Sequence, residues 1–73
     1  MKERIVCKRL KGLMVENELT LQALAEMIGI SENSLTQKIN GHRGFWYWEM
    51  VAIAQVFRGD LETVFPELVT KSA

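Results

Sequence analysis

Two short amphipathic segments, separated by only three residues, constrain this sequence more than any other feature. Apolar side chains recur at helical spacing in both segments: Leu24, Ala25 and Ile28 in the first, Leu35 and Ile39 in the second. The intervening Gly29-Ile30-Ser31 forms a tight turn with the apolar Ile30 tucked inside. Two helices joined so closely, with a small alanine where they cross, predict a helix-turn-helix.

Local start and stop signals agree with this prediction. Thr20 and Ser31 stand where their hydroxyl oxygens can cap the two helices. Gly29 can adopt the left-handed conformation that ends the first of them. The second is expected to end near Asn40-Gly41.

The rest of the chain also predicts helices. Helical periodicity covers residues 2–16, with Cys7 on the apolar stripe, and residues 46–57, and Asp60 can cap a short helix that ends at Pro66. Alternation typical of strands is absent. We therefore expect one all-α domain of five helices over residues 1–73, with a core at about 5–66 and a frayed tail at 67–73.

Composition excludes several classes of function. A single cysteine and a single histidine (Cys7 and His42) give neither an intrachain disulfide nor a structural zinc site. No apolar run is long enough to span a membrane, and the charged N-terminal segment is unlike a signal peptide, so we expect a cytoplasmic protein. No catalytic constellation or glycine-rich phosphate loop is present, which predicts no enzymatic activity, no cofactor and no small-molecule substrate.

The chain resembles a known family in two runs. TLQALAEMIGISENSLTQKING (residues 20–41) is similar to the helix-turn-helix of Cro and lambda-repressor-like phage regulators, and GFWYWEMVAIAQVF (residues 44–57) is similar to the helix that follows it. The resemblance covers about residues 5–66. It implies a five-helix lambda-repressor-like domain that docks its third helix in the DNA major groove. The implied function is a Cro-like, sequence-specific transcription regulator from a phage or prophage, with a double-stranded operator as its partner.

Base-reading residues are expected on the outward face of the third helix. Asn33 and Gln37 point away from Leu35 and Ile39, and both side-chain types can pair bidentately with adenine. Thr36 flanks these two residues, and Glu32 could accept a hydrogen bond from cytosine N4. Alternatives remain open here. The whole face could be an ordinary solvated helix surface. Glu32 could instead repel phosphates, or interact with the positive end of the helix dipole.

Contacts with the DNA backbone are expected around the same helix. Such contacts need only charge, hydrogen-bonding capacity and reach. The residues assigned to them with the help of the resemblance are Thr20, Ser34, Lys38, His42 and Arg43. The alternative for the loop at 41–44 is a solvated surface.

Four features favour a different partner. The net charge is zero, Leu21 stands where the family usually has a phosphate-binding Gln, and Glu32 stands where a basic residue is common. Four consecutive aromatic residues, Phe45 to Trp48, cannot all face inward at the start of a helix. The resemblance places Trp46 and Trp48 at positions that are usually polar and exposed, so we expect these two to form a protein interface. The partner would be a second subunit, another regulator such as a repressor, or the DNA backbone. An antirepressor that binds a regulator instead of DNA is therefore the alternative function.

Overall fold

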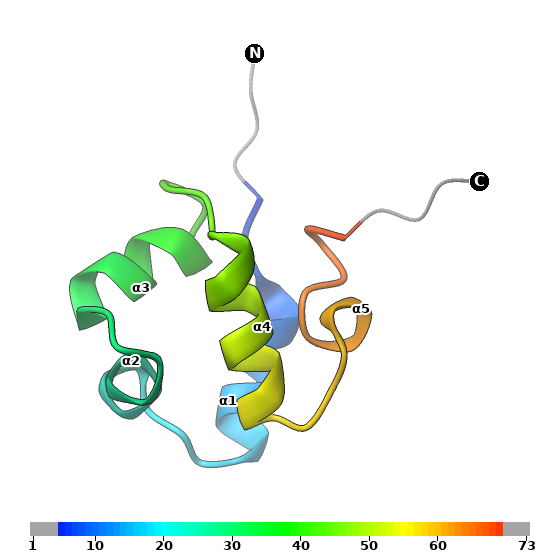
Figure 1. Cartoon of the computed structure of the whole chain (residues 1–73), viewed down its shortest axis with the longest axis horizontal. Coiled ribbons are helices and arrows are strands. Elements are labelled where there is room, and N and C mark those ends of the chain that lie inside the picture. Colours follow the sequence, from blue (N-terminus) through cyan, green and yellow to red (C-terminus); the bar gives the residue numbers. More distant parts are fainter. Residues whose placement is uncertain (1–4, 70–73) are drawn as a thin grey trace.

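The computed structural model describes residues 5–69, and this part of the chain consists of five helices and contains no strand (Figure 1). The helices are α1 (Lys8–Glu16), α2 (Leu21–Ile28), α3 (Glu32–Ile39), α4 (Tyr47–Val56) and α5 (Leu61–Val64). α2 and α3 lie on one side of α4, and α5 lies on the other. The predicted all-α, five-helix fold is confirmed. None of these helices has the length and apolarity needed to cross a membrane.

The predicted caps are present at three helix starts. Thr20 Oγ1 accepts from the Ala23 N–H at 3.1 Å, and Ser31 Oγ accepts from the Ser34 N–H at 3.0 Å. Asp60 Oδ1 accepts from the Thr63 N–H at 2.8 Å. Each bond satisfies a backbone donor that has no partner within its own helix, so short-range chemistry sets these boundaries.

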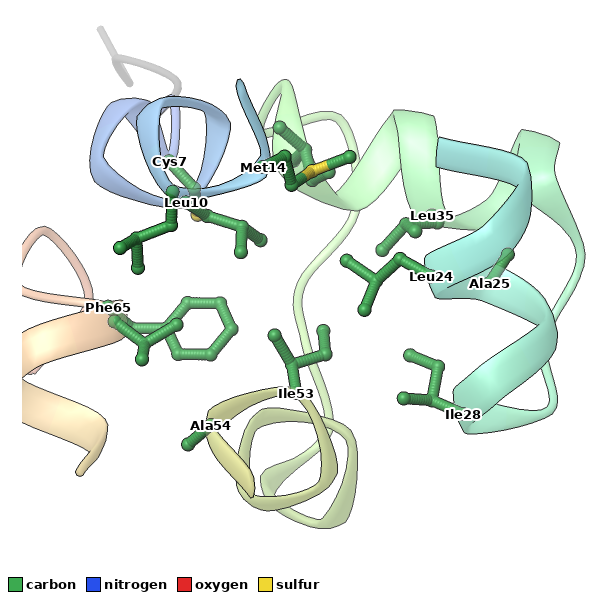
Figure 2. Packing of buried hydrophobic residues seen from close by; sticks show 13 residues of the cluster. Cys7, Leu10, Met14, Leu24, Ala25, Ile28, Leu35, Ile53, Ala54 and Phe65 are labelled. Carbon is green, nitrogen blue, oxygen red and sulfur yellow. The ribbon is translucent and has the colours of Figure 1, made fainter. Parts of the chain in front are cut away.

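The hydrophobic core lies where the helices meet (Figure 2). Its largest fully buried apolar side chains come from all five helices or their ends: Leu10, Leu24, Leu35, Ile53, Val64 and Phe65. Phe45, which precedes α4, packs edge-on against Phe65 with ring centroids 5.1 Å apart. The core therefore fixes α3 through its inward residues and leaves the opposite side of that helix outside.

The first helix begins later than predicted. Residues 5–7 are not helical, and α1 starts at Lys8. Cys7 is fully buried as expected, but its backbone N–H donates to the Ile39 carbonyl at 2.9 Å. This backbone donor is therefore paired with the end of α3 and not within a longer α1. Residues 2–4 lie outside the described part.

The predicted fraying of the tail is wrong for residues 67–69. The Leu68 and Val69 side chains pack against the core, and both N–H groups donate to the Phe65 carbonyl at 3.0 Å. Glu67 Oε2 accepts from the Arg9 N–H at 3.0 Å, which ties this segment to α1. The expectation failed because these contacts join residues far apart in the sequence. Residues 70–73 lie outside the described part.

Candidate nucleic-acid interface

The turn between α2 and α3 is fixed by backbone hydrogen bonds. The Ala25 carbonyl accepts from both the Gly29 N–H at 2.8 Å and the Ile30 N–H at 3.0 Å. Gly29 has a φ of 82°, a conformation that glycine adopts without strain. Because the turn is so short, the direction of α3 follows directly from that of α2.

The two faces of α3 differ in chemistry. Leu35 and Ile39 are buried, whereas Glu32 and Asn33 are exposed and Gln37 is half-buried. The structure therefore places the predicted base-reading residues Asn33 and Gln37 outside the core. The amide side chains of Asn33 and Gln37 offer both donors and acceptors to a partner.

Ser34 and Thr36 are more constrained than their sequence positions suggest. Both are half-buried, and Thr36 Oγ1 donates to the Glu32 carbonyl one turn earlier at 3.0 Å. Thr36 also lines an apolar groove whose rim includes Lys11 and Asn40. Its side chain thus faces the α1 side of α3 and lies off the centre of the face that carries Asn33 and Gln37.

The loop after α3 is held against the end of that helix. The N–H groups of His42 and Arg43 both donate to the Gln37 carbonyl, at 2.8 and 3.3 Å. Both side chains are exposed, as is Thr20 at the start of α2. These three residues from the predicted backbone-contacting set are therefore accessible, and Thr20 also serves as a helix cap.

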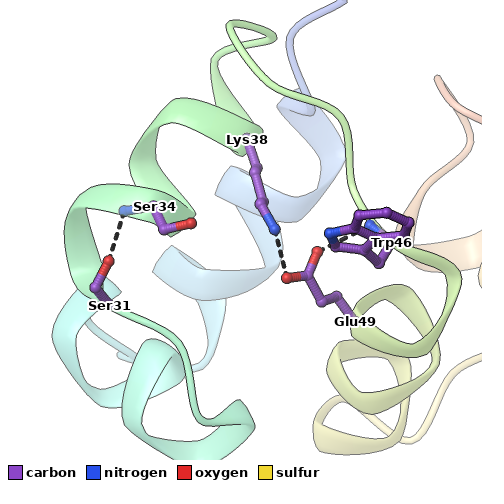
Figure 3. Close-up of polar contacts among 5 residues, drawn as sticks. All are labelled: Ser31, Ser34, Lys38, Trp46 and Glu49. Carbon is purple, nitrogen blue, oxygen red and sulfur yellow. Dashed lines mark hydrogen bonds and ion pairs between the residues drawn. The ribbon is translucent and has the colours of Figure 1, made fainter.

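Lys38 does not have the position predicted for it. Its side chain is only 4% exposed, and Nζ forms an ion pair with the carboxylate of Glu49, whose side chain is 2% exposed (Figure 3). A buried, paired ammonium is not available to a DNA phosphate, so the prediction of a backbone contact is wrong. Lys38 follows Leu35 by three residues, which places it on the inward side of α3.

Glu49 uses its second oxygen to cap α4. Its Oε1 accepts from the Trp46 N–H at 2.9 Å, one half of a capping box. Trp46 carries no side-chain oxygen, so it cannot supply the reciprocal bond. Sequence reasoning missed the joint role of Glu49. The sequence did contain a signal for this ion pair: Lys38 lies on the apolar side of one helix, and Glu49 lies in the first turn of the next.

Three consecutive aromatic side chains at the start of α4 are exposed. Trp46 is 67%, Tyr47 71% and Trp48 54% exposed, and we call these three residues the aromatic patch. Phe45 alone of the four consecutive aromatics packs into the core. Large exposed apolar side chains that lie together are typical of interaction surfaces.

Residues 5–69 contain no cluster of three or more histidine, cysteine, aspartate or glutamate side chains suited to a metal ion. The arrangement around α3 instead offers amides, hydroxyls and one accessible guanidinium. Its chemistry is that of hydrogen-bonded recognition.

A tight turn that presents the polar face of a second helix defines a helix-turn-helix domain. The model of the Cro/C1-type HTH DNA-binding domain matches residues 9–65, and the chain belongs to this family. Among solved structures, it is similar to the clp gene regulator ClgR from C. glutamicum, with a TM-score of 0.74 and 17% sequence identity over 88% of this chain and 83% of that one. At this identity the likeness shows the fold. No curated protein sequence matches the chain.

Proposed function

We propose that this chain is a Cro-like, sequence-specific transcription regulator, encoded by a phage or prophage and acting in the cytoplasm. One observation carries the proposal: Asn33 and Gln37 lie on the outer side of α3, whose inner side is fixed in the core. In a duplex, α3 would occupy the major groove and these amides would read base edges. Membership of a DNA-binding family supports the same assignment.

The exposed residues beside α3 would position the domain on the DNA. Arg43 and His42 follow the end of the helix, and Thr20 lies at the start of α2. Contacts of this kind carry no sequence information but fix register. A homodimer would place two α3 helices in successive turns of the major groove, roughly 34–36 Å apart.

Selection of duplexes from a random library, followed by binding measurements across salt concentrations, tests this function. We expect an enriched sequence whose affinity exceeds that of a scrambled duplex by at least about 1,000-fold. The affinity for both should fall steeply as salt rises, because phosphate contacts release counterions. Failure to enrich any sequence would contradict the proposal.

A second function is favoured by the aromatic patch and by the burial of Lys38 in an ion pair, where its ammonium cannot contact a phosphate. On this alternative, the chain is an antirepressor that binds another regulator through Trp46 and Trp48. It would bind DNA weakly and show little sequence preference. Co-purification with a repressor from the same phage or prophage, together with no enriched duplex, would favour this function over DNA reading.

A further inference from the structure

The Glu49 carboxylate joins two parts of the candidate interface. Oε2 pairs with Lys38 in the last turn of α3, and Oε1 accepts from the N–H of Trp46 at the start of α4. Figure 3 shows the carboxylate between these two groups. One buried group therefore connects the end of the helix proposed to read DNA with the helix that follows it.

The remaining side-chain contacts that hold α3 are largely apolar. Leu35 and Ile39 are buried in the core, and such packing has no strong directional preference. A charge-assisted hydrogen bond depends on both distance and angle, so it selects one orientation among several that fill the core equally well. The Lys38–Glu49 pair adds such a bond at the end of α3.

Stability alone does not account for a buried ion pair. Removing two charges from water is costly, and apolar replacements of similar volume are often as stable or more stable. Fixing one arrangement of neighbouring elements is a role that buried polar groups have in some proteins. Lys38 precedes Ile39 and follows Gln37 directly, so a small rotation of α3 at this pair moves the Gln37 side chain as well.

We propose that Lys38 and Glu49 are positioning residues that set the orientation of α3 relative to α4, and thereby the discrimination between DNA sequences. They do not contribute to the general affinity for DNA, because both charges are buried and cancel. This inference rests on the proposed DNA-reading function. It assigns a role to two residues that touch neither base nor phosphate.

Two double variants with the same net charge as the wild type test the proposal. Lys38→Met with Glu49→Gln keeps an acceptor for the Trp46 N–H but removes the bond between α3 and α4. Lys38→Gln with Glu49→Gln keeps the acceptor and allows a neutral hydrogen bond between the helices. For each, the affinities for the duplex that the wild type selects and for a scrambled duplex are measured at one salt concentration, and folding is checked by circular dichroism.

We expect the Met-Gln variant to bind the scrambled duplex within about twofold of the wild type and to lose at least about tenfold in the ratio of the two affinities. The Gln-Gln variant should retain most of that ratio. A folded Met-Gln variant with the wild-type ratio would overturn the inference, and so would a Gln-Gln variant that loses discrimination. If the Met-Gln variant does not fold, the Gln-Gln variant decides: retention of the ratio supports the inference, and loss of discrimination overturns it. A wild type that prefers no duplex contradicts the proposed function itself.

Discussion

Glu67 Oε2 accepts a hydrogen bond from the Arg9 backbone N–H at 3.0 Å, across 58 positions of sequence. Cys7, the residue before α1, makes no side-chain capping bond to that helix. The cap of α1 therefore comes from the other end of the domain. A carboxylate at this place also interacts favourably with the positive end of the helix dipole.

Removing this cap should destabilise the domain. We expect Glu67→Ala to lower the free energy of unfolding by about 1 kcal/mol, a typical value for a lost helix cap, and the melting temperature by about 4–8 °C. Glu26→Ala, at an exposed position on α2, is the control and should change stability by no more than about 0.5 kcal/mol. Equal effects in thermal melts of the two variants would contradict a capping role for Glu67.

Gln37 should be a base-reading residue. We expect Gln37→Ala to cost about 1–3 kcal/mol on the selected duplex and to relax the preference at one base pair, because a bidentate amide–base contact is lost. Gln55→Ala removes the same side chain from an exposed position on α4 and should leave binding unchanged. Equal weakening on selected and scrambled duplexes would show that Gln37 does not read a base.

Arg43 should contact phosphate. Neutralising it in Arg43→Gln should weaken all sequences alike and reduce the slope of log affinity against log salt by about 1. Arg58→Gln removes an exposed charge just after the opposite end of α4 and should leave the slope unchanged. The charge-balanced change Lys38→Met with Glu49→Gln should also leave it unchanged, because the two charges are already buried and paired. A slope that Arg43→Gln does not alter would count against the contact.

The aromatic patch should mediate association. The double change Trp46→Thr with Trp48→Lys removes two exposed indoles and supplies the hydroxyl that would complete a capping box with Glu49. We expect a melting temperature within a few degrees of the wild type and a loss of self-association, or of partner binding, in analytical ultracentrifugation. Association at the wild-type level would argue that these side chains form no interface.

Cys7 should make stability depend on pH in the alkaline range. Burial raises the pKa of its thiol from 9.0 to about 11, Glu67 adds to the increase, and Lys11 opposes it. Above about pH 9 the unfolded chain releases the thiol proton while the folded chain retains it, so the free energy of unfolding falls as the pH rises toward 11. The loss should reach about 2–3 kcal/mol. Urea titrations of the wild type and Cys7→Ala should diverge in this range, and parallel curves would refute the assignment.

Local chemistry made much of this fold predictable from sequence. Thr20, Ser31 and Asp60 cap helices that begin at the next residue, and Gly29 ends α2 with a positive φ. Each of these features depends on residues within one helical turn. The apolar spacing within α2 and α3 similarly predicts which side of each helix faces the core.

Contacts between distant residues limited the prediction of the site. Lys38 is a charged residue in a polar run, and its burial depends on a carboxylate 11 residues later. Glu67 follows a proline, and no neighbouring residue in the sequence indicates which helix it caps. When the partner of a side chain lies on another helix, the contact depends on how the two helices pack. The spacing of apolar residues along the sequence does not show this packing.

The attachment of α3 at both ends has a consequence for the shape of the DNA. The tight turn at Gly29-Ile30-Ser31 fixes its start, and the Cys7 N–H and the Glu49 carboxylate hold its end. A helix held in this way has little freedom to tilt into a groove that does not match it. In the proposed complex, the duplex rather than the protein would have to bend or twist. Its flexible base steps would then influence affinity even where no side chain reaches them.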